Sequence, residues 1–260
     1  MPDPVLTHLT DGVLTVTIHR PEKKNAITTA MYAALADAFD RAATHPAIRV
    51  VLLHGAGDAF TAGNDLADFA SNPPTGEESP VFRFLTAIST APKPVVAAVH
   101  GAAVGIGTTM LLHCDLVYAA PEARLQLPFV SLGLSPEAAA SFLLPLFTSP
   151  TRAAELLLLG EPFSGEQALA WGLVNETVPA ADLFEHALGR ARALARKPPA
   201  SVRLTKSFLR RAHATAVQTT LRAEAEAFLE RLQSPEAAEA FTAFFEKRAP
   251  DFSAFDAADD

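Results

Sequence analysis

Two glycine-bearing segments carry the residue types best suited to chemistry. The first reads Ala-Phe-Thr-Ala-Gly-Asn-Asp-Leu at residues 59–66, and the second reads Gly-Ala-Ala-Val-Gly-Ile-Gly at residues 101–107. Glycine lets the backbone turn so that amide groups point outward and a ligand can approach closely. Backbone donors cannot rotate away, and losing one such donor to a developing oxyanion typically costs roughly 2.7 to 4 kcal/mol of transition-state stabilisation. The two segments therefore indicate a site that stabilises a negatively charged oxygen.

Other catalytic patterns are incomplete or missing in the sequence. Gly105 and Gly107 follow an apolar run, but Met110 stands where a dinucleotide fingerprint needs its third glycine. The eight histidines are scattered without a His-Glu-x-x-His or paired-cysteine spacing, so the sequence predicts no metal site. The Gly-x-Ser-x-Gly elbow of a serine hydrolase is also lacking. These observations argue against an oxidoreductase of the Rossmann type, a metalloenzyme and a serine hydrolase.

Composition excludes further classes of function. The chain has 260 residues, of which 49% are hydrophobic and 19% charged, enough to bury the core of one large domain. Its formal net charge of -8 argues against nucleic-acid and membrane-surface partners, because both require a basic face. The single cysteine, Cys114, fits a reducing compartment. With no secretory signal visible at the N-terminus, we predict a cytoplasmic location.

Apolar periodicity predicts an α/β fold. Alternation from Leu14 to Ile18 is typical of a strand, and Met31, Leu35 and Phe39 recur every four residues along a helix over about residues 29–43. Short apolar runs closed by turn residues predict buried, parallel strands. These runs lie at residues 50–53, 95–99 and 116–119.

Helix signals dominate after about residue 135. Ser149-Pro150 and Gly160 bound one predicted helix, and Ser164 with Gln167 forms a capping box at the start of another. Prolines at 198 and 199 interrupt an otherwise helical stretch. We therefore predict a core of residues 1–197 that carries the site and a C-terminal helical region of residues 198–260, for which the resemblance described below implies a role in oligomerisation. Between the strands and helices, proline-rich residues 71–80 predict a loop that can cover a site.

In their order and spacing the glycine segments resemble the crotonase, or enoyl-CoA hydratase/isomerase, superfamily. The similarity includes Asn-Ala-Ile at residues 25–27 and Cys114-Asp115, Pro128, Gly133 and residues 160–174, and it runs from about residue 10 to 215. It implies a crotonase-like spiral of ββα units followed by a C-terminal helical trimerisation region. The implied assembly is a homotrimer, often paired as a hexamer.

The resemblance also implies the positions of the binding groups. The backbone N–H groups of Asn64 and Ile106 match the two oxyanion donors that hold the thioester oxygen of a coenzyme A substrate. Lys24 matches a position in the coenzyme-binding loop, although a solvated lysine remains an alternative. The residues expected to line the adenine and pantetheine channel are Ala26, Ala62, Asp65 and Leu66. Coenzyme A would arrive as part of the acyl-CoA thioester substrate, so no separate cofactor is predicted.

The acid and base distinguish the reactions within this family. Enoyl-CoA hydratases use two glutamates, and here the matching positions hold Thr109 and Phe129, which cannot act as a general base. Residues 133–138 instead resemble the peroxisomal-type Δ3,Δ2-enoyl-CoA isomerases, whose single catalytic glutamate matches Glu137. This resemblance implies an isomerase of fatty-acid metabolism (β-oxidation) that shifts a double bond from C3 to C2 of an enoyl-CoA.

Several alternatives remain open at this point. Ser135, Pro136 and Glu137 together are also typical of an ordinary helix start, where the helix dipole favours a carboxylate. Asp65 could fix a turn or act as an acid or base. The chain could be an enoyl-CoA hydratase, or catalyse another crotonase reaction on a CoA thioester. It could also be a noncatalytic acyl-CoA-binding module on the same fold, since a fold by itself does not define a function.

Overall fold

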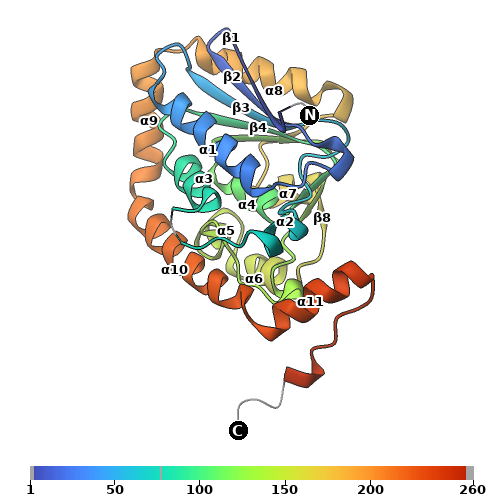
Figure 1. Cartoon of the computed structure of the whole chain (residues 1–260). Helices are drawn as coiled ribbons and strands as arrows, with labels where there is room; N and C mark the ends of the chain where they lie inside the picture. The colour runs from blue at the N-terminus through green and yellow to red at the C-terminus, as the bar shows by residue number, and fades with distance from the viewer. Residues whose placement is uncertain (1–2, 77, 256–260) are drawn as a thin grey trace.

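A six-stranded sheet forms one half of the molecule in the computed structural model, which describes residues 3–76 and 78–255 (Figure 1). The strand order is β1-β2-β3-β4-β6-β9. β1 and β2 pair antiparallel, and every other neighbouring pair in this sheet is parallel. The strands are β1 (Val5–Thr10), β2 (Val13–Ile18), β3 (Val50–Gly55), β4 (Val95–Val99), β6 (Leu116–Ala119) and β9 (Glu176–Thr177).

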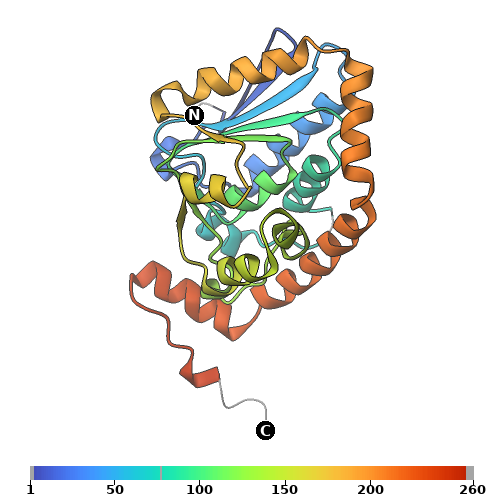
Figure 2. The ribbon, with the colours of Figure 1, turned by 180° about the vertical axis from the view of Figure 1, so that it is seen from behind.

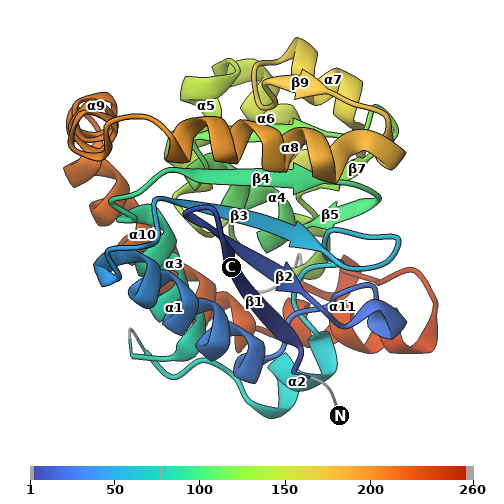
Figure 3. The same cartoon turned by 90° about the horizontal axis from the view of Figure 1, so that it is seen from above.

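The central strands confirm the expectation drawn from the apolar runs. All five residues of β4 are buried, and the first four of β3 are buried as well. Helices cover both faces of the sheet, which is why these strands are apolar on both sides rather than alternating. Figures 1 and 3 show α8 (Ala180–Ala195) on one face and α1 (Thr29–Thr44) with α3 (Pro80–Ser89) on the other.

A second, three-stranded sheet lies beside the glycine segments. It contains β5 (Ala102–Val104), β7 (Arg124–Gln126) and β8 (Phe163–Ser164), with β5 parallel and β8 antiparallel to β7. The fold is thus α/β, as predicted, and each of its two sheets also contains an antiparallel pair.

Short helices fill the half of the molecule below the large sheet. The helix from Ser149-Pro150 to Gly160 and the capping box of Ser164 and Gln167 are confirmed. The elements here are α2 (Leu66–Ser71), α4 (Ile106–Thr109), α5 (Ala140–Phe147), α6 (Pro150–Leu159) and α7 (Gly165–Ala170), with the 3₁₀ helices η1 (Pro21–Lys23), η2 (Met110–His113) and η3 (Val130–Leu132).

The C-terminal helices wrap around one side and the bottom of this core (Figures 1 and 2). They are α9 (Pro199–Arg211), α10 (Ala214–Leu232) and α11 (Pro235–Glu246), followed by the 3₁₀ turn η4 (Ser253–Phe255). α10 packs against α5, and α11 packs against η3. The division at residues 197 and 198 stays a prediction. Each helix within the described residues is too short or too polar to cross a bilayer.

Candidate active site

Hydrogen bonds on two sides fix the first glycine segment. On one side Thr61 N donates to Ala102 O (2.9 Å) and Val104 N donates to Thr61 O (3.0 Å). On the other side Ile27 N donates to Gly63 O (2.8 Å) and Asp65 N donates to Ile27 O (2.9 Å). Because Gly63 and Asp65 both face Ile27, the backbone N–H of the intervening Asn64 must point away from it.

Gly63 is required for the close approach of the two segments. Its φ is +89°, and a Cβ atom built there would lie 2.6 Å from Val104 O. An L side chain would therefore be strained by the backbone and would also collide with the neighbouring chain. This explains why the residue before Asn64 is glycine.

Asn25 holds the turn that precedes this segment. Its buried side chain donates from Nδ2 to Ala56 O (2.7 Å) and Ala59 O (2.6 Å), while its Oδ1 accepts from Arg20 N (2.8 Å). Its own carbonyl accepts from the Thr61 hydroxyl (2.7 Å). The Asn25 side chain thus fixes the backbone that leads into the first glycine segment and does not itself take part in the chemistry.

The second segment ends at the start of α4. Gly105, with φ +56°, is the N-cap, and Ile106 is the first helical residue. The first N–H groups of a helix have no partner within it, so the Ile106 amide is available to a ligand. Asn64 and Ile106 line the same cavity.

That cavity has a volume of about 620 Å³ and is largely apolar. Five of the residues predicted to bind coenzyme A or the oxyanion line it together with Ile106: Ala26, Ala62, Asn64, Asp65 and Leu66. Lys24 does not line it, whereas the preceding Lys23 does. Aromatic residues of the C-terminal helices also line the cavity: Phe228, Phe241, Phe244 and Phe245.

Asp65 is the N-cap of α2. Its Oδ1 accepts from Ala67 N and Asp68 N, both at 3.1 Å, and its Oδ2 pairs with Arg20 Nη1 at 2.6 Å. Burial opposes ionisation of this carboxyl, but the Arg20 hydrogen bond and the two amides outweigh it and lower the pKa of Asp65. Such a group is a structural anion that fixes the turn, which is one of the two alternatives raised by the sequence.

Glu137 does not begin a helix, so that alternative is wrong. Residues 134–137 have no regular structure, and α5 starts only at Ala140. Glu137 is 6% exposed, and its Oε1 accepts a hydrogen bond from the Thr109 hydroxyl. Burial raises the pKa of Glu137 to about 8; the Thr109 bond opposes this rise and the charge of Glu224 adds to it. Ionisation of Glu137 therefore occurs near neutral pH rather than near pH 4.5.

The two residues after Glu137 have an unusual backbone. Ala138 (φ 60°) and Ala139 (φ 57°) are both left-handed. This conformation costs an L-residue roughly 1–2 kcal/mol. His113 helps to hold it, because its Nε2 donates to Ala138 O at 2.7 Å. Strain of this kind persists only where surrounding structure over-determines it, and it is concentrated at functional sites.

Glu137 is not among the described residues that line the 620 Å³ cavity, but two neighbours connect it to the paired amides. Thr109 lies three residues after Ile106 on α4. Tyr32 of α1 donates its hydroxyl hydrogen to Asn64 Oδ1, and burial together with the Glu137 charge raises the pKa of Tyr32. Glu137 thus lies within electrostatic reach of the Asn64 turn.

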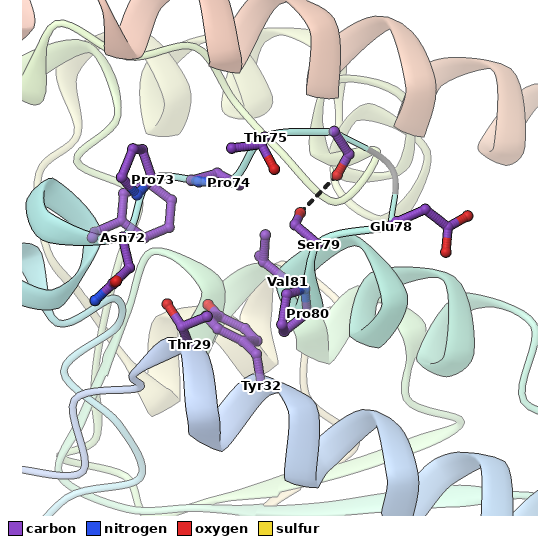
Figure 4. Close-up of a pocket in the computed structure, with 12 residues that line it drawn as sticks. Thr29, Tyr32, Asn72, Pro73, Pro74, Thr75, Glu78, Ser79, Pro80 and Val81 are labelled. Atoms are coloured by element: carbon purple, nitrogen blue, oxygen red, sulfur yellow. Dashed lines mark hydrogen bonds between the residues drawn. The ribbon is translucent and has the colours of Figure 1, made fainter.

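A second cavity, of about 560 Å³, lies next to Tyr32. Figure 4 shows Thr29 and Tyr32 of α1 facing Pro80 and Val81, with the loop at Pro73 to Thr75 crossing opposite them. Phe69 lines both cavities. The predicted loop at residues 71–80, described except for residue 77, therefore covers a cavity that adjoins the first.

Sequence reasoning missed three contributors: Tyr32, Arg20 and the contact of Thr109 with Glu137. Tyr32 follows Met31 and lies three residues before Leu35 on the apolar stripe of α1. A hydroxyl group on an otherwise apolar helix face was the available signal, because buried tyrosine hydroxyls find partners. No sequence pattern links Thr109 or Arg20 to their partners, which are 28 and 45 residues away.

The comparisons with known proteins identify the family. A family model described as enoyl-CoA hydratase/isomerase matches residues 8–254. Enoyl-CoA delta isomerase 2 of Homo sapiens is 36% identical over 208 residues, 77% of this chain, and the match spans 52% of that longer protein. The 1,2-epoxyphenylacetyl-CoA isomerase of Escherichia coli is 36% identical over 96% of this chain and 98% of its own. Other relatives carry hydratase names.

A solved structure extends the similarity to three dimensions. The enoyl-CoA hydratase/isomerase of Pseudoalteromonas atlantica has a TM-score of 0.93 and 44% identity, covering 96% of this chain and 100% of that one. Fold and site together define an α/β protein of the crotonase superfamily. The chain belongs to the enoyl-CoA hydratase/isomerase family.

Proposed function

We propose that the protein is an acyl-CoA isomerase that shifts a double bond from C3 to C2 of an enoyl-CoA. The Glu137 carboxylate removes a proton from C2, and the thioester oxygen of the resulting dienolate accepts hydrogen bonds from the amides of Asn64 and Ile106. The Glu137 carboxylic acid then returns the proton to C4. Bonds and charge balance without a cofactor other than the coenzyme A carried by the substrate.

The single carboxylate carries this proposal. Thr109 and Phe129 occupy the positions of the two hydratase glutamates, and Thr109 is a hydrogen-bond donor to Glu137. An acid–base group is most effective when its pKa lies near the working pH, because it must both accept and release the proton. A pKa of about 8 for Glu137 suits both steps.

The two cavities support the placement of the substrate. We place the pantetheine arm in the 620 Å³ cavity and the acyl chain toward the 560 Å³ cavity beside Tyr32, with Phe69 between them. Lys23, which lines the first cavity, and the predicted Lys24 are the cations nearest the start of the coenzyme-binding loop. A homotrimer or hexamer and a cytoplasmic location remain predictions.

Two substrates test the proposal directly. Purified protein is given a 3-enoyl-CoA and, separately, the matching 2-enoyl-CoA, and the products are separated by chromatography. We expect conversion of the first substrate to 2-enoyl-CoA and little 3-hydroxyacyl-CoA from the second. Faster formation of hydroxyacyl product would make the protein a hydratase. Binding without turnover of either substrate would favour the noncatalytic acyl-CoA-binding module.

A further inference from the structure

A second buried glutamate holds the chain immediately after Glu137. Glu224 lies on α10 and is 7% exposed. Its Oε1 accepts from Ser141 N at 2.9 Å. The Ser141 side chain and the amides of Ser141, Ala139 and Ala140 favour its ionised form. α5 therefore receives its N-terminal cap from a residue 83 positions later in the chain.

This contact and the His113 hydrogen bond hold the strained turn at two points. His113 binds Ala138 O, whereas Glu224 binds Ser141 N. The two left-handed residues thus lie between two buried side chains, one from η2 and one from α10. Because Glu137 directly precedes this pair, the position of its carboxyl depends on both contacts.

Capping by itself does not require a charged residue. An amide oxygen would accept the same hydrogen bonds, and it would not carry a buried charge. Glu224 Oε2 is buried without a hydrogen-bond partner among the described residues, and burial raises the pKa of Glu224 although the Ser141 side chain and the amides at the start of α5 lower it. A carboxylate at this position thus buries a charge that a glutamine would not carry.

Burial is the main cause of the raised pKa of Glu137, and the charge of Glu224 adds to it. Around Glu137, Thr109 of α4 is neutral, and the buried phenol of Tyr32 keeps its proton because its pKa is raised. Burial lowers the pKa of His113 to about 4 despite its bond to Ala138 O, and the charges of Arg210 and Lys206 also lower it, so this imidazole is neutral at physiological pH. A negative charge close to a carboxyl disfavours its ionisation.

We propose that Glu224 is a positioning residue for Glu137, which it serves by capping the turn that carries the base. From the same position its negative charge also opposes loss of the Glu137 proton. The inference rests on the proposed role of Glu137 as the base. It also makes the C-terminal helical region part of the site, since α10 supplies the second carboxylate.

The charge is tested with Glu224→Gln, and Glu226→Gln is the matched control. Glu226 lies on the same helix but is exposed. Isomerase activity is measured from pH 5 to 10, where the rate rises as the base loses its proton. Two interacting carboxyls titrate as a pair. When the charge of Glu224 is removed, Glu137 should lose its proton in a single step and at a lower pH. We expect the rise in rate at the acidic side of the pH–rate profile (the acid limb) to shift to lower pH in Glu224→Gln and not in Glu226→Gln. An unshifted limb would overturn the electrostatic role.

The cap is tested by comparing Glu224→Gln with Glu224→Ala at the high-pH plateau. Glutamine retains an acceptor for the α5 amides and should keep kcat near the wild-type value. Alanine removes it, and we expect kcat to fall on the order of tenfold to a hundredfold, because a small misplacement of a catalytic group has this effect, with a smaller change in KM. Equal plateau rates for both variants would overturn the positioning role.

Failure of the proposed function can be recognised separately. If Glu137→Gln keeps wild-type turnover, Glu137 is not the base and the proposed function fails. If Glu137→Gln is inactive and the acid limb of Glu224→Gln is unshifted, only the inference about Glu224 fails. Thermal unfolding of every variant confirms that the rates refer to folded protein.

Discussion

The C-terminal helices contact the core through charged side chains at two places. Opposite charges meet at one place and like charges at the other. Where α9 meets β4 and β6, Asp115 pairs with Lys206 Nζ at 2.6 Å and with Arg210 Nη2 at 3.0 Å. Where α10 meets α5, Glu224 lies near Glu137, a group of the same charge. We call the first the Asp115 cluster and the second the glutamate pair.

Hydrogen bonding differs between the two places as well. In the Asp115 cluster Lys206 also donates to Lys93 O (2.7 Å), and Val95 N donates to Asp115 Oδ2 (2.7 Å). In the glutamate pair one carboxylate oxygen of Glu224 has no partner within the described residues, and the turn beside it is left-handed. The cluster is a satisfied attachment point for a helix, whereas the pair keeps an unfavourable charge arrangement.

The Asp115 cluster therefore serves the stability of the fold, whereas the glutamate pair serves the proposed chemistry. Two basic residues of α9, Lys206 and Arg210, are used within the fold, where both pair with Asp115. Like charges in the glutamate pair destabilise the folded state and raise the proton affinity of Glu137. Such a loss of stability is typical of functional sites, because an acid–base group there needs a perturbed pKa.

The largest expected effect comes from Glu137→Gln. The variant retains the volume of the side chain but cannot accept a proton, so kcat should fall about 10²- to 10⁴-fold. Turnover of 3-enoyl-CoA measures it, with Glu226→Gln as the control. Loss of activity without loss of folding would place chemistry in the glutamate pair and not in the Asp115 cluster.

Asp115→Asn should have the opposite profile. Asparagine leaves Lys206, whose side chain is 7% exposed, without its anion, and breaking a buried ion pair costs about 3–5 kcal/mol of unfolding free energy. Urea unfolding measures this loss, and exposed Asp182→Asn is the control. The kcat of the folded fraction should remain near wild type. A large drop in kcat at unchanged stability would contradict the comparison.

Stability should depend on pH through Glu137. The unfolded carboxyl ionises above about pH 4.5, but the folded one holds its proton to about pH 8, so the folded state binds more protons in this window. Unfolding free energy should therefore fall as pH rises from 4.5 to 8. One pK unit corresponds to about 1.4 kcal/mol, and Glu137→Gln should remain more stable than wild type at pH 9 by a few kcal/mol. Equal curves for both proteins would refute a buried, ionising Glu137.

The smallest effect is expected from Tyr32→Phe. Loss of the hydroxyl leaves Asn64 Oδ1 unpaired and loosens the turn that carries the Asn64 amide, which should cost about 1 kcal/mol, or about fivefold in kcat/KM. The only other tyrosine, Tyr118, accepts from Arg190 Nε at 3.1 Å instead. Tyr118→Phe is the matched control, and an equal loss of activity in both variants would remove Tyr32 from the site.

Local patterns predicted the elements of this fold well. Three predictions are confirmed: the capping box at Ser164, the helix that ends at Gly160 and the buried parallel strands. Each could be predicted because it depends on residues close in sequence. The start of α5 could not be predicted from the sequence. Ser135, Pro136 and Glu137 have the composition of a helix start, but contacts from His113 and Glu224 stabilise a left-handed turn that delays the helix to Ala140.

The sequence by itself determined the family and the α/β class. Both follow from the order and spacing of Asn25, residues 62–66 and residues 99–105 and from the apolar periodicity, which depend only on the order of residues along the chain. Tertiary structure alone decided that Thr109, Tyr32 and Glu224 surround Glu137, and that Lys206 binds Asp115 rather than a ligand. The physical reason is that burial and the neighbouring charges set the pKa of a carboxyl. Those neighbours come from helices that are far apart in sequence and adjacent only after folding.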